Sequence, residues 1–489
     1  MSAPHQDGID DAPEMLDADD ALEEVLDNEG DVAMDSDDEP EEINLYNDSI
    51  AYFDAHKDSV FAIAQHPTQP SLIATGGSEG DGDDAPGKGY VFDTSPVVGR
   101  PVLPASYNAD PSSQPQKSFE LKPLFTIEGH SDSINTLAFT LPNGEFLVSG
   151  GLDGRLRTYQ LSVDGHNKPS FAFLAESQEV PEVNWLAPCP SQKFPNTIAL
   201  GASDGSVWVY TIDASDSANP MQIVQSYFLH TGACTAGSWS PDGTFLATVS
   251  EDSSLYVWDV WGEAAAKNVV NDNGQTVVSL TGEDQRFSVE GGLYSVAIDP
   301  KTTFVAVGGA GGSIKIVGLP RLGTDTQPVN SKQSKSKAKG AEAGAAQGGT
   351  ILADLHTQSD GIETLSFSSK QPLLAAGSVD GSIVVYDTSR RFAVRRHIKE
   401  AHEDFSVVKV EFIAGLGDGW LLTSCGMDGV VRRWDVRGVA TSKESSLVKE
   451  WRGHRGDGEG GGVLGFVEGS TGERVVTAGD DGVVLVFEA

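Results

Sequence analysis

Four segments of the sequence carry a histidine, a hydroxyl residue and an aspartate that could together perform nucleophilic chemistry. A hydroxyl beside a histidine that is held by a carboxylate is the arrangement used in triad hydrolysis. The sets are His130, Ser149 and Asp153; His230, Thr248 and Asp252; His402, Ser424 and Asp428; and His454, Thr477 and Asp481. Whether they are catalytic or structural depends on the elements that carry them.

Each set lies within one copy of an internal repeat. Clear copies begin at GHSDSINTLAF (Gly129), HTGACTAGSW (His230), SDGIETLSF (Ser359) and HEDFSVVKVEF (His402), and weaker ones run over 55–94, 179–212, 290–319 and 453–489. Every copy contains three short apolar runs separated by turn signals such as Asp-Gly, and a fourth run precedes the next copy. Four strands in a unit of roughly 40–45 residues predict a propeller blade. We therefore expect an all-β, eight-bladed β-propeller.

The repeats resemble the WD40 family over about residues 43–489. In that family the histidine, the hydroxyl, the turn aspartate and a tryptophan form a hydrogen-bonded set within a blade. Trp258 and Trp434 complete two of the sets, whereas Tyr159 and Phe487 replace the tryptophan in the other two. The resemblance implies that the sets are structural and that the protein is not an enzyme. The fifth copy has Gly311 at the aspartate position, and we expect packing alone to hold that blade.

The ends of the repeat region predict how the ring closes. The eighth copy ends with VVLVFEA, three strands into its blade, and unpaired strand edges favour aggregation. We expect residues 48–56, DSIAYFDAH, to supply the missing fourth strand. The predicted organisation is thus a tail over 1–42 and a propeller over 43–489, with flexible loops at 95–118 and 324–349.

The chain is strongly acidic, and the acidity has two sources. It holds 72 Asp and Glu against 33 Lys and Arg, a formal net charge of -39. Residues 1–42 contain 18 of the acids and no Lys or Arg, which predicts a disordered tail that either solvates the protein or competes for its basic ligand. The other 54 acids still outnumber the 33 bases. Such a surface repels nucleic acid and anionic lipid and attracts a basic partner.

Several other features limit the function. The three scattered cysteines predict a reducing compartment, and no apolar run reaches the length of a membrane span. We therefore expect a monomer in the cytoplasm or nucleus with no membrane contact. No CxxC motif and no histidine pair with zinc spacing occurs, so neither a metal nor a cofactor is expected.

The WD40 resemblance also indicates where a partner would bind. In that family the usual ligand face is formed by the loops that enter each blade and by the loops between its second and third strands. Acids dominate these positions here, with Lys409 as an exception, and aromatic residues occupy the nearest first-strand positions. Carboxylates and aromatic rings suit Arg and Lys through charge-assisted hydrogen bonds and cation–π contacts. The candidates are Asp58, Phe61, Asp132, Glu182, Trp185, Glu251, Glu290, Tyr294, Asp360, Glu363, Glu403, Asp404, Asp457 and Asp480.

An acidic tail that runs into AYFDAHKDSVFAIAQHP, together with eight repeats and two insertions, resembles a particular WD40 group. It comprises dedicated chaperones of a large-subunit ribosomal protein (uL-sixteen, protein ten of the eukaryotic large subunit) and the angio-associated migratory cell proteins. The resemblance implies capture of that basic ribosomal protein by its N-terminal segment and delivery to late pre-60S particles. Two alternatives remain: a scaffold or substrate receptor in signalling or ubiquitin ligation, and a chaperone of another basic protein such as a histone.

Overall fold

The structure is a computed structural model of the chain. It describes residues 47–80, 82, 85–97, 118–165, 168–322, 348–415, 417–438, 446–455, 461–469 and 472–489. The predicted acidic tail and most of the two predicted flexible loops lie outside these residues. Leu45–Ala489 forms one compact unit, which is described below.

The described strands form eight sheets, as expected for eight blades, and all pairings are antiparallel except that of β1 with β5. The first four blades are β2 (Ala62–Gln65), β3 (Leu72–Ser78), β4 (Gly87–Asp93) and β6 (Pro123–Ile127); β7 (Ile134–Phe139), β8 (Phe146–Gly151), β9 (Leu156–Val163) and β10 (Pro169–Ser177); β11 (Val183–Pro188), β12 (Thr197–Ala202), β13 (Val207–Ile212) and β14 (Met221–Tyr227); and β15 (Cys234–Trp239), β16 (Phe245–Ser250), β17 (Leu255–Asp259) and β18 (Thr276–Leu280).

The remaining blades follow the same order, apart from the last. They are β19 (Leu293–Ile298), β20 (Phe304–Gly309), β21 (Ser313–Gly318) and β22 (Ile351–His356); β23 (Ile362–Phe367), β24 (Leu373–Ser378), β25 (Ile383–Asp387) and β26 (Ala393–Ile398); β27 (Val407–Phe412), β28 (Leu421–Gly426), β29 (Val431–Asp435) and β30 (Leu447–Trp451); and β31 (Val463–Val467), β32 (Arg474–Gly479) and β33 (Val484–Glu488) with β1 (Ala51–Phe53) and β5 (Phe119–Glu120). Short 3-10 turns lie at Ser95–Val97, Ala265–Lys267, Ala310–Gly312, Thr388–Arg390 and Gly417–Gly419.

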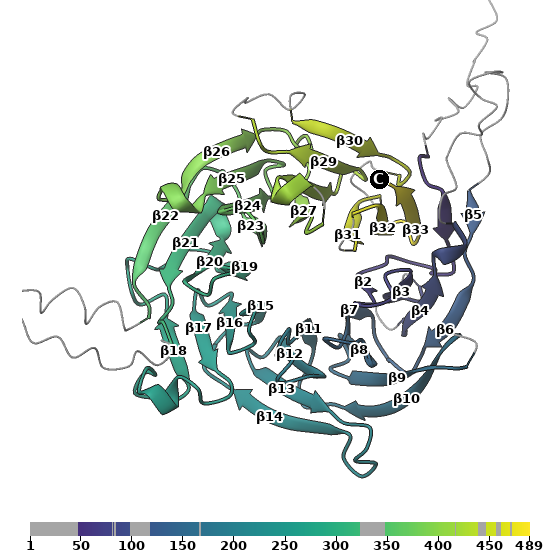
Figure 1. Cartoon of the computed structure of the whole chain (residues 1–489), viewed down its shortest axis with the longest axis horizontal. Coiled ribbons are helices and arrows are strands. Elements are labelled where there is room, and N and C mark those ends of the chain that lie inside the picture. Colours follow the sequence, from purple (N-terminus) through teal and green to yellow (C-terminus); the bar gives the residue numbers. More distant parts are fainter. Residues whose placement is uncertain are drawn as a thin grey trace, which may run out of the picture. The chain divides into compact units, whose positions relative to one another are not determined.

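The first strands of the blades form the inner wall of a ring (Figure 1). Each first strand contacts the first strand of the next blade, and β31 contacts β2, so the ring is closed. The apolar cores lie between adjacent blades. For example, Leu255 and Val257 of β17 belong to one buried cluster with Val305 and Val307 of β20. Because apolar side chains occur on both faces of these middle strands, each sheet packs against both of its neighbours.

The last blade joins the two ends of the repeat region, which confirms the predicted closure. β1 pairs antiparallel with β33, with Ala51 opposite Val486 and Phe53 opposite Val484. The sequence analysis missed β5, a two-residue strand that pairs in parallel with β1 and covers its outer edge. Phe53 is 1% exposed and stacks on Phe92 of the first blade, with ring centroids 4.7 Å apart.

The fifth blade forms a complete four-stranded sheet although its copy lacks the turn aspartate. Gly311 adopts a φ of 63° in the turn, and Val317 at the usual aromatic position is fully buried. Val317 belongs to the apolar cluster shared with the fourth blade. In the described part of the chain, no helix is long and apolar enough to cross a membrane.

Candidate partner-binding face

Two sets of loops lie together on one face of the ring, which we call the acidic face. In the second to eighth blades, the loop between the second and third strands donates a backbone hydrogen bond to the segment that enters the same blade. These bonds join Leu152 to Ser133, Ser203 to Glu182, Glu251 to Ala233, Ala310 to Gly292, Val379 to Gly361, Met427 to Ser406 and Asp480 to Gly462. Residues that are far apart in each repeat therefore contribute to one surface.

Glycines in the turns allow the loops of adjacent blades to approach closely. Gly381 has a φ of +77°, and a Cβ atom there would lie 2.0 Å from the carbonyl oxygen of Glu403 in the next blade. Gly482 has a φ of +76°, and a Cβ atom there would lie 3.2 Å from the carbonyl oxygen of Asp58, which enters the first blade. Only glycine meets both demands at Gly381, the left-handed conformation and the lack of space. The loop that carries Glu403 thus packs closely on the turn that contains Gly381.

Four of the predicted carboxylates are held in place by hydrogen bonds. Asp58, Asp132 and Asp360 each accept one from the backbone N–H of the following residue, at 2.8, 2.6 and 2.7 Å. The Oγ atom of Ser59 donates to Asp480 Oδ1 at 2.6 Å. These contacts fix the orientation of the carboxylates while each retains acceptor capacity for a ligand.

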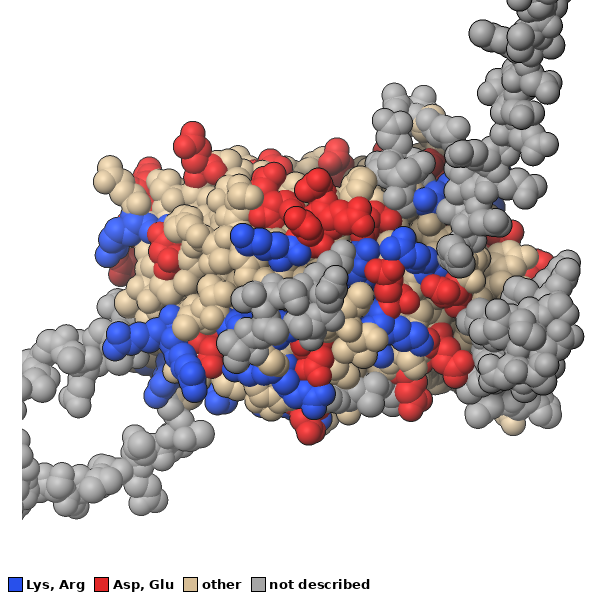
Figure 2. All heavy atoms as spheres, turned by 90° about the horizontal axis from the view of Figure 1, so that it is seen from above, with Lys and Arg blue, Asp and Glu red and all other residues tan. Residues whose placement is uncertain are grey.

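The remaining predicted acids on this face are exposed. Within the described residues their side chains make no hydrogen bond or ion pair with the protein, so their acceptors are available to a partner. They are Glu182, Glu251, Glu290, Glu363, Glu403 and Asp404; Asp457 lies outside the described residues. Figure 2, a view of the rim, shows acidic side chains gathered toward one edge of the ring. Partial burial, together with the charge of Asp360, raises the pKa of Glu363, so an added cation would relieve an unfavourable interaction there.

The three predicted aromatic residues differ in accessibility. Phe61 is 42% exposed, whereas Trp185 and Tyr294 are half-buried. The indole of Trp185 occupies a slot made by two glycines: a Cβ atom on Gly201 would lie 2.2 Å from its Nε1, and one on Gly237 would lie 2.1 Å from its Cη2. The Tyr294 hydroxyl donates to the carbonyl of Gly291 at 2.7 Å. Phe61 is therefore the aromatic ring most open to a partner.

A repeated irregularity in the inner strands, which the sequence analysis missed, sets which side chains line this face. In seven blades the register shifts between the first and third residues of the inner strand, as in a β-bulge. Three of the intervening side chains donate hydrogen bonds to the next inner strand, and Glu363 and Tyr294 occupy the same position in their blades. The three bonds are Asn135 to Val183 O at 2.7 Å, Asn184 to Cys234 O at 3.0 Å and Thr235 to Leu293 O at 2.6 Å.

The four His, Ser or Thr, and Asp sets lie within their blades and are largely buried. In each set the histidine Nε2 lies 2.7–2.8 Å from the hydroxyl: His130 and Ser149, His230 and Thr248, His402 and Ser424, and His454 and Thr477. The histidine Nδ1 lies 2.8–3.0 Å from Asp153, Asp428 and Asp481 in three of them. These hydroxyls belong to fully buried residues of the second strand of each blade. This geometry supports the structural role.

Two sets contain features that the sequence did not indicate. The Nδ1 atom of His230 lies 2.5 Å from Ser254 Oγ, and Asp252 is reached through that serine, 4.0 Å from the ring. Burial lowers the pKa of His230 to about 4. In the seventh blade Arg432, which is 1% exposed, pairs with Asp428.

Trp258 and Trp434 complete their sets, because each indole N–H donates to the set's hydroxyl at 2.8 Å. The described residues contain no group of three or more His, Cys, Asp or Glu side chains that could hold a metal ion. The polar constellations of the blades therefore offer neither an open nucleophile nor a metal site in the part of the chain that the structure describes.

Comparison with known proteins places the chain among such propellers. The family model described as "WD domain, G-beta repeat" matches residues 121–160, 221–259 and 349–387. The crystal structure of Chaetomium thermophilum Sqt1 bound to the N-terminus of the ribosomal protein L10 is 62% identical, with a TM-score of 0.78, and covers 91% of this chain and 100% of that one.

Two curated relatives are more distant in sequence but match over similar lengths. The ribosome assembly protein SQT1 of Saccharomyces cerevisiae is 28% identical over 94% of this chain and 91% of its own. The human angio-associated migratory cell protein is 23% identical over 90% of this chain and 80% of its own. The blades, the closing strand and the extent of the Chaetomium match together show that the chain belongs to the Sqt1 family of WD40-repeat proteins.

Proposed function

We propose that this chain is a ribosome-assembly chaperone that captures the basic N-terminal segment of a newly made large-subunit ribosomal protein on its acidic face. The observation that carries the proposal is the set of exposed carboxylates on that face without partners in the described residues. The Sqt1 of Chaetomium thermophilum, a relative over nearly the whole chain, is bound to the N-terminus of ribosomal protein L10.

Physical chemistry supports the same partner. A ribosomal protein that has not yet met its RNA exposes Arg and Lys side chains, which carboxylates bind through charge-assisted hydrogen bonds. A surface of one sign also accelerates the encounter with an oppositely charged segment. Phe61, 42% exposed and directly before the inner strand β2, offers a ring for a cation–π contact.

The proposed role involves binding and release rather than a chemical step. The chain would shield the basic segment during synthesis and escort the ribosomal protein to late pre-60S particles. Direct contact with nucleic acid is not part of this proposal, because the acidic face repels phosphate.

Fluorescence anisotropy with a labelled peptide of the L10 N-terminal segment tests the proposal. We expect binding that weakens as salt rises and that falls about tenfold or more, about 1.4 kcal/mol, in the Glu251→Lys/Glu363→Lys double variant. The matched control is Asp272→Lys/Glu473→Lys, which makes the same charge change at exposed acids in loops of the other face.

Equal losses in both double variants would show that net charge alone attracts the peptide, and no binding by the unaltered protein would refute the proposal. A histone-tail peptide in the same assay separates the alternative basic client, since equal affinity for it would remove the preference for the ribosomal protein. A pull-down from lysate, washed at low and at high salt, then identifies the natural partner.

A further inference from the structure

Two adjoining cavities lie along the inner wall of the ring, lined by residues of the first, second, third, seventh and eighth blades. The upper one, about 200 Å³, is lined by the beginnings of inner strands and includes Phe61 and Leu464. The lower one, about 580 Å³, is lined by the ends of those strands and includes Gln65 and Val467. Lys409 and Leu137 line both cavities. Since the inner strands begin at the acidic face, the two cavities form a path from that face into the ring.

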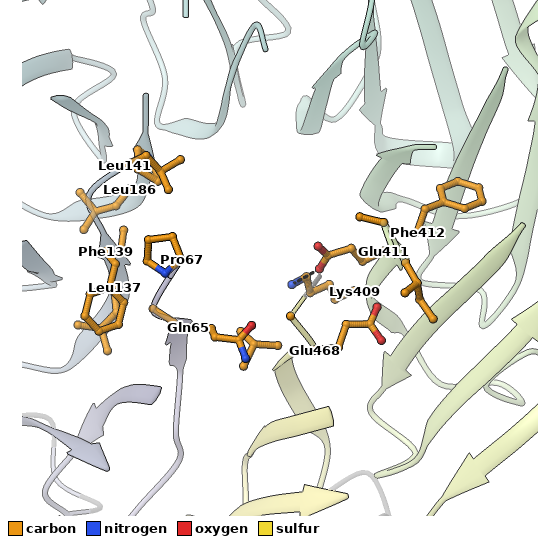
Figure 3. A pocket seen from close by; sticks show the side chains of 17 residues that line it. Gln65, Pro67, Leu137, Phe139, Leu141, Leu186, Lys409, Glu411, Phe412 and Glu468 are labelled. Atoms are coloured by element: carbon orange, nitrogen blue, oxygen red, sulfur yellow. Dashed lines mark ion pairs between the residues drawn. The ribbon is translucent and has the colours of Figure 1, made fainter. Parts of the chain in front are cut away.

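The lower cavity has two chemically different walls (Figure 3). Pro67, Leu137, Leu141 and Leu186 form an apolar wall from the first three blades. Lys409, Glu411 and Glu468 lie together on the opposite side, on elements of the seventh and eighth blades. A ligand that fills this space must therefore combine an apolar part with a polar or charged part.

The charged wall holds two carboxylates, each paired with one cation. Lys409 Nζ lies 2.8 Å from Glu411 Oε2 and donates to the carbonyl of Phe466 at 2.9 Å. Burial alone would lower the pKa of Lys409, but Glu411 outweighs it and the pKa is raised. Lys409 is thus a charged lysine that is engaged by Glu411, whereas Glu468 pairs with Arg433 through its Oε2 atom.

Glu468 has an acceptor that the protein leaves unused. The Glu468 residue is 6% exposed, and its Oε2 accepts hydrogen bonds from Thr423 Oγ1 at 2.9 Å and from Arg433 Nη2 at 3.0 Å. Its Oε1 is buried and has no hydrogen-bond partner among the described residues. Burial and the charge of Glu411 raise the pKa of Glu468 to about 7. An unsatisfied carboxylate oxygen beside a cavity costs free energy, which a cationic donor would recover.

We propose that the lower cavity is a binding pocket for a lysine or arginine side chain of the client segment, which enters the ring from the acidic face. The cationic group would lie between Glu411 and Glu468, and its aliphatic stem would pack on the apolar wall, as long basic side chains do. Ala62 lines the upper cavity and Gln65 the lower one, and they are three residues apart in β2, about 10 Å. That distance exceeds the length of a side chain, so the client backbone itself enters the upper cavity.

This inference rests on the proposed function, and two measurements test it. In the anisotropy assay we expect the Glu411→Gln/Glu468→Gln double variant to bind the L10 N-terminal peptide about tenfold more weakly, as for loss of a charge-assisted hydrogen bond. Glutamine keeps the shape of both side chains, and Glu473→Gln, an exposed site outside the cavity, is the control. An unchanged unfolding midpoint would show that the double variant is folded.

Photo-crosslinking supplies a readout that does not depend on these substitutions. p-Benzoylphenylalanine in place of Leu186, which lines the lower cavity, should capture the bound peptide. The same group in place of Leu229, which is exposed in the loop that enters the fourth blade, should also capture it. Capture at 229 alone, with full affinity in the double glutamine variant, would overturn the pocket and leave the proposed function intact. Absence of peptide binding to the unaltered protein would instead refute both.

Discussion

The Oγ atom of Ser59 donates a 2.6 Å hydrogen bond to Oδ1 of Asp480, which joins the segment entering the first blade to a turn of the last. The adjacent backbone strengthens the same junction, because Val60 N–H donates to the carbonyl of Gly479 at 3.0 Å. One of the predicted partner-binding carboxylates is therefore also part of the ring closure. Binding at the acidic face and the stability of the closed ring are linked at this point.

Closure by β1 predicts a large loss of stability when the side chain of its last residue, Phe53, is shortened. Phe53 is 1% exposed and packs on Phe92 and Tyr90, so Phe53→Ala should lower the free energy of unfolding by about 3–5 kcal/mol. Urea denaturation measures this change. Asp54→Ala, at the adjacent exposed position, is the control and should alter stability by less than about 0.5 kcal/mol; equal effects would show that β1 does not close the ring.

The turn glycines predict that the same substitution, glycine to alanine, lowers stability by different amounts at two positions. Gly381→Ala places a Cβ atom 2.0 Å from the carbonyl oxygen of Glu403, whereas a Cβ atom on Gly262, with a φ of +74°, meets nothing within 4 Å. We expect Gly262→Ala to cost about 1 kcal/mol from backbone strain alone. Gly381→Ala should cost clearly more and should shift the loop that carries Glu403. Thermal unfolding compares the two, and similar midpoints would contradict the close packing of the loops.

Buried neutral histidines predict a loss of stability in mild acid. The pKa of His230 is lowered to about 4 by burial, and that of His56 to about 4 by the same cause. Because the unfolded chain binds protons below a pH of about 6.5 and the folded state does not, the unfolding free energy should fall as the pH drops from 6.5 toward 4. His230→Gln should reduce this slope without abolishing it, since His56 still contributes, as do His66 and His397, whose pKa values are also lowered by burial. Urea midpoints at a series of pH values provide the test.

The paired acids at the sixth blade predict the pH dependence of partner binding. Partial burial and Asp360 raise the pKa of Glu363, so acidification protonates Glu363 before an ordinary glutamate. A basic peptide should therefore lose affinity as the pH falls through this raised pKa, and Glu363→Gln should bind more weakly at neutral pH but with a flatter profile. Parallel profiles for the two proteins would exclude Glu363 from the binding site.

Much of the architecture was predictable from the sequence because turn signals separate the strands within each repeat. Asp-Gly turns and alternating apolar runs predicted eight blades, and the incomplete last copy predicted the closing strand at Ala51–Phe53. β5 was missed because a pairing of two residues leaves no pattern in the sequence. The bulges in the inner strands were missed for a related reason: a one-residue register shift depends on the neighbouring strand and not on local periodicity.

The candidate site was predictable in location more than in detail. Loop position alone brought Asp58 and Asp480 onto one face, but their link through Ser59 depends on the closed ring. The slot that half-buries Trp185 depends on glycines in two other strands. Glu468 carried no signal, because an isolated acid in a short loop resembles a solvated one until the fold surrounds it.

The pairing of β1 with β33 also has a consequence for synthesis. Phe53 leaves the ribosome 431 residues before its partner Val484, which corresponds to roughly 20–90 s at ordinary elongation rates. Throughout that interval the β1 segment lacks its antiparallel partner β33, and the apolar side chains that it will bury against the last blade remain accessible to other proteins. A chain of this family thus passes through its own vulnerable nascent state before it can shield a client, and the last blade sets when that state ends.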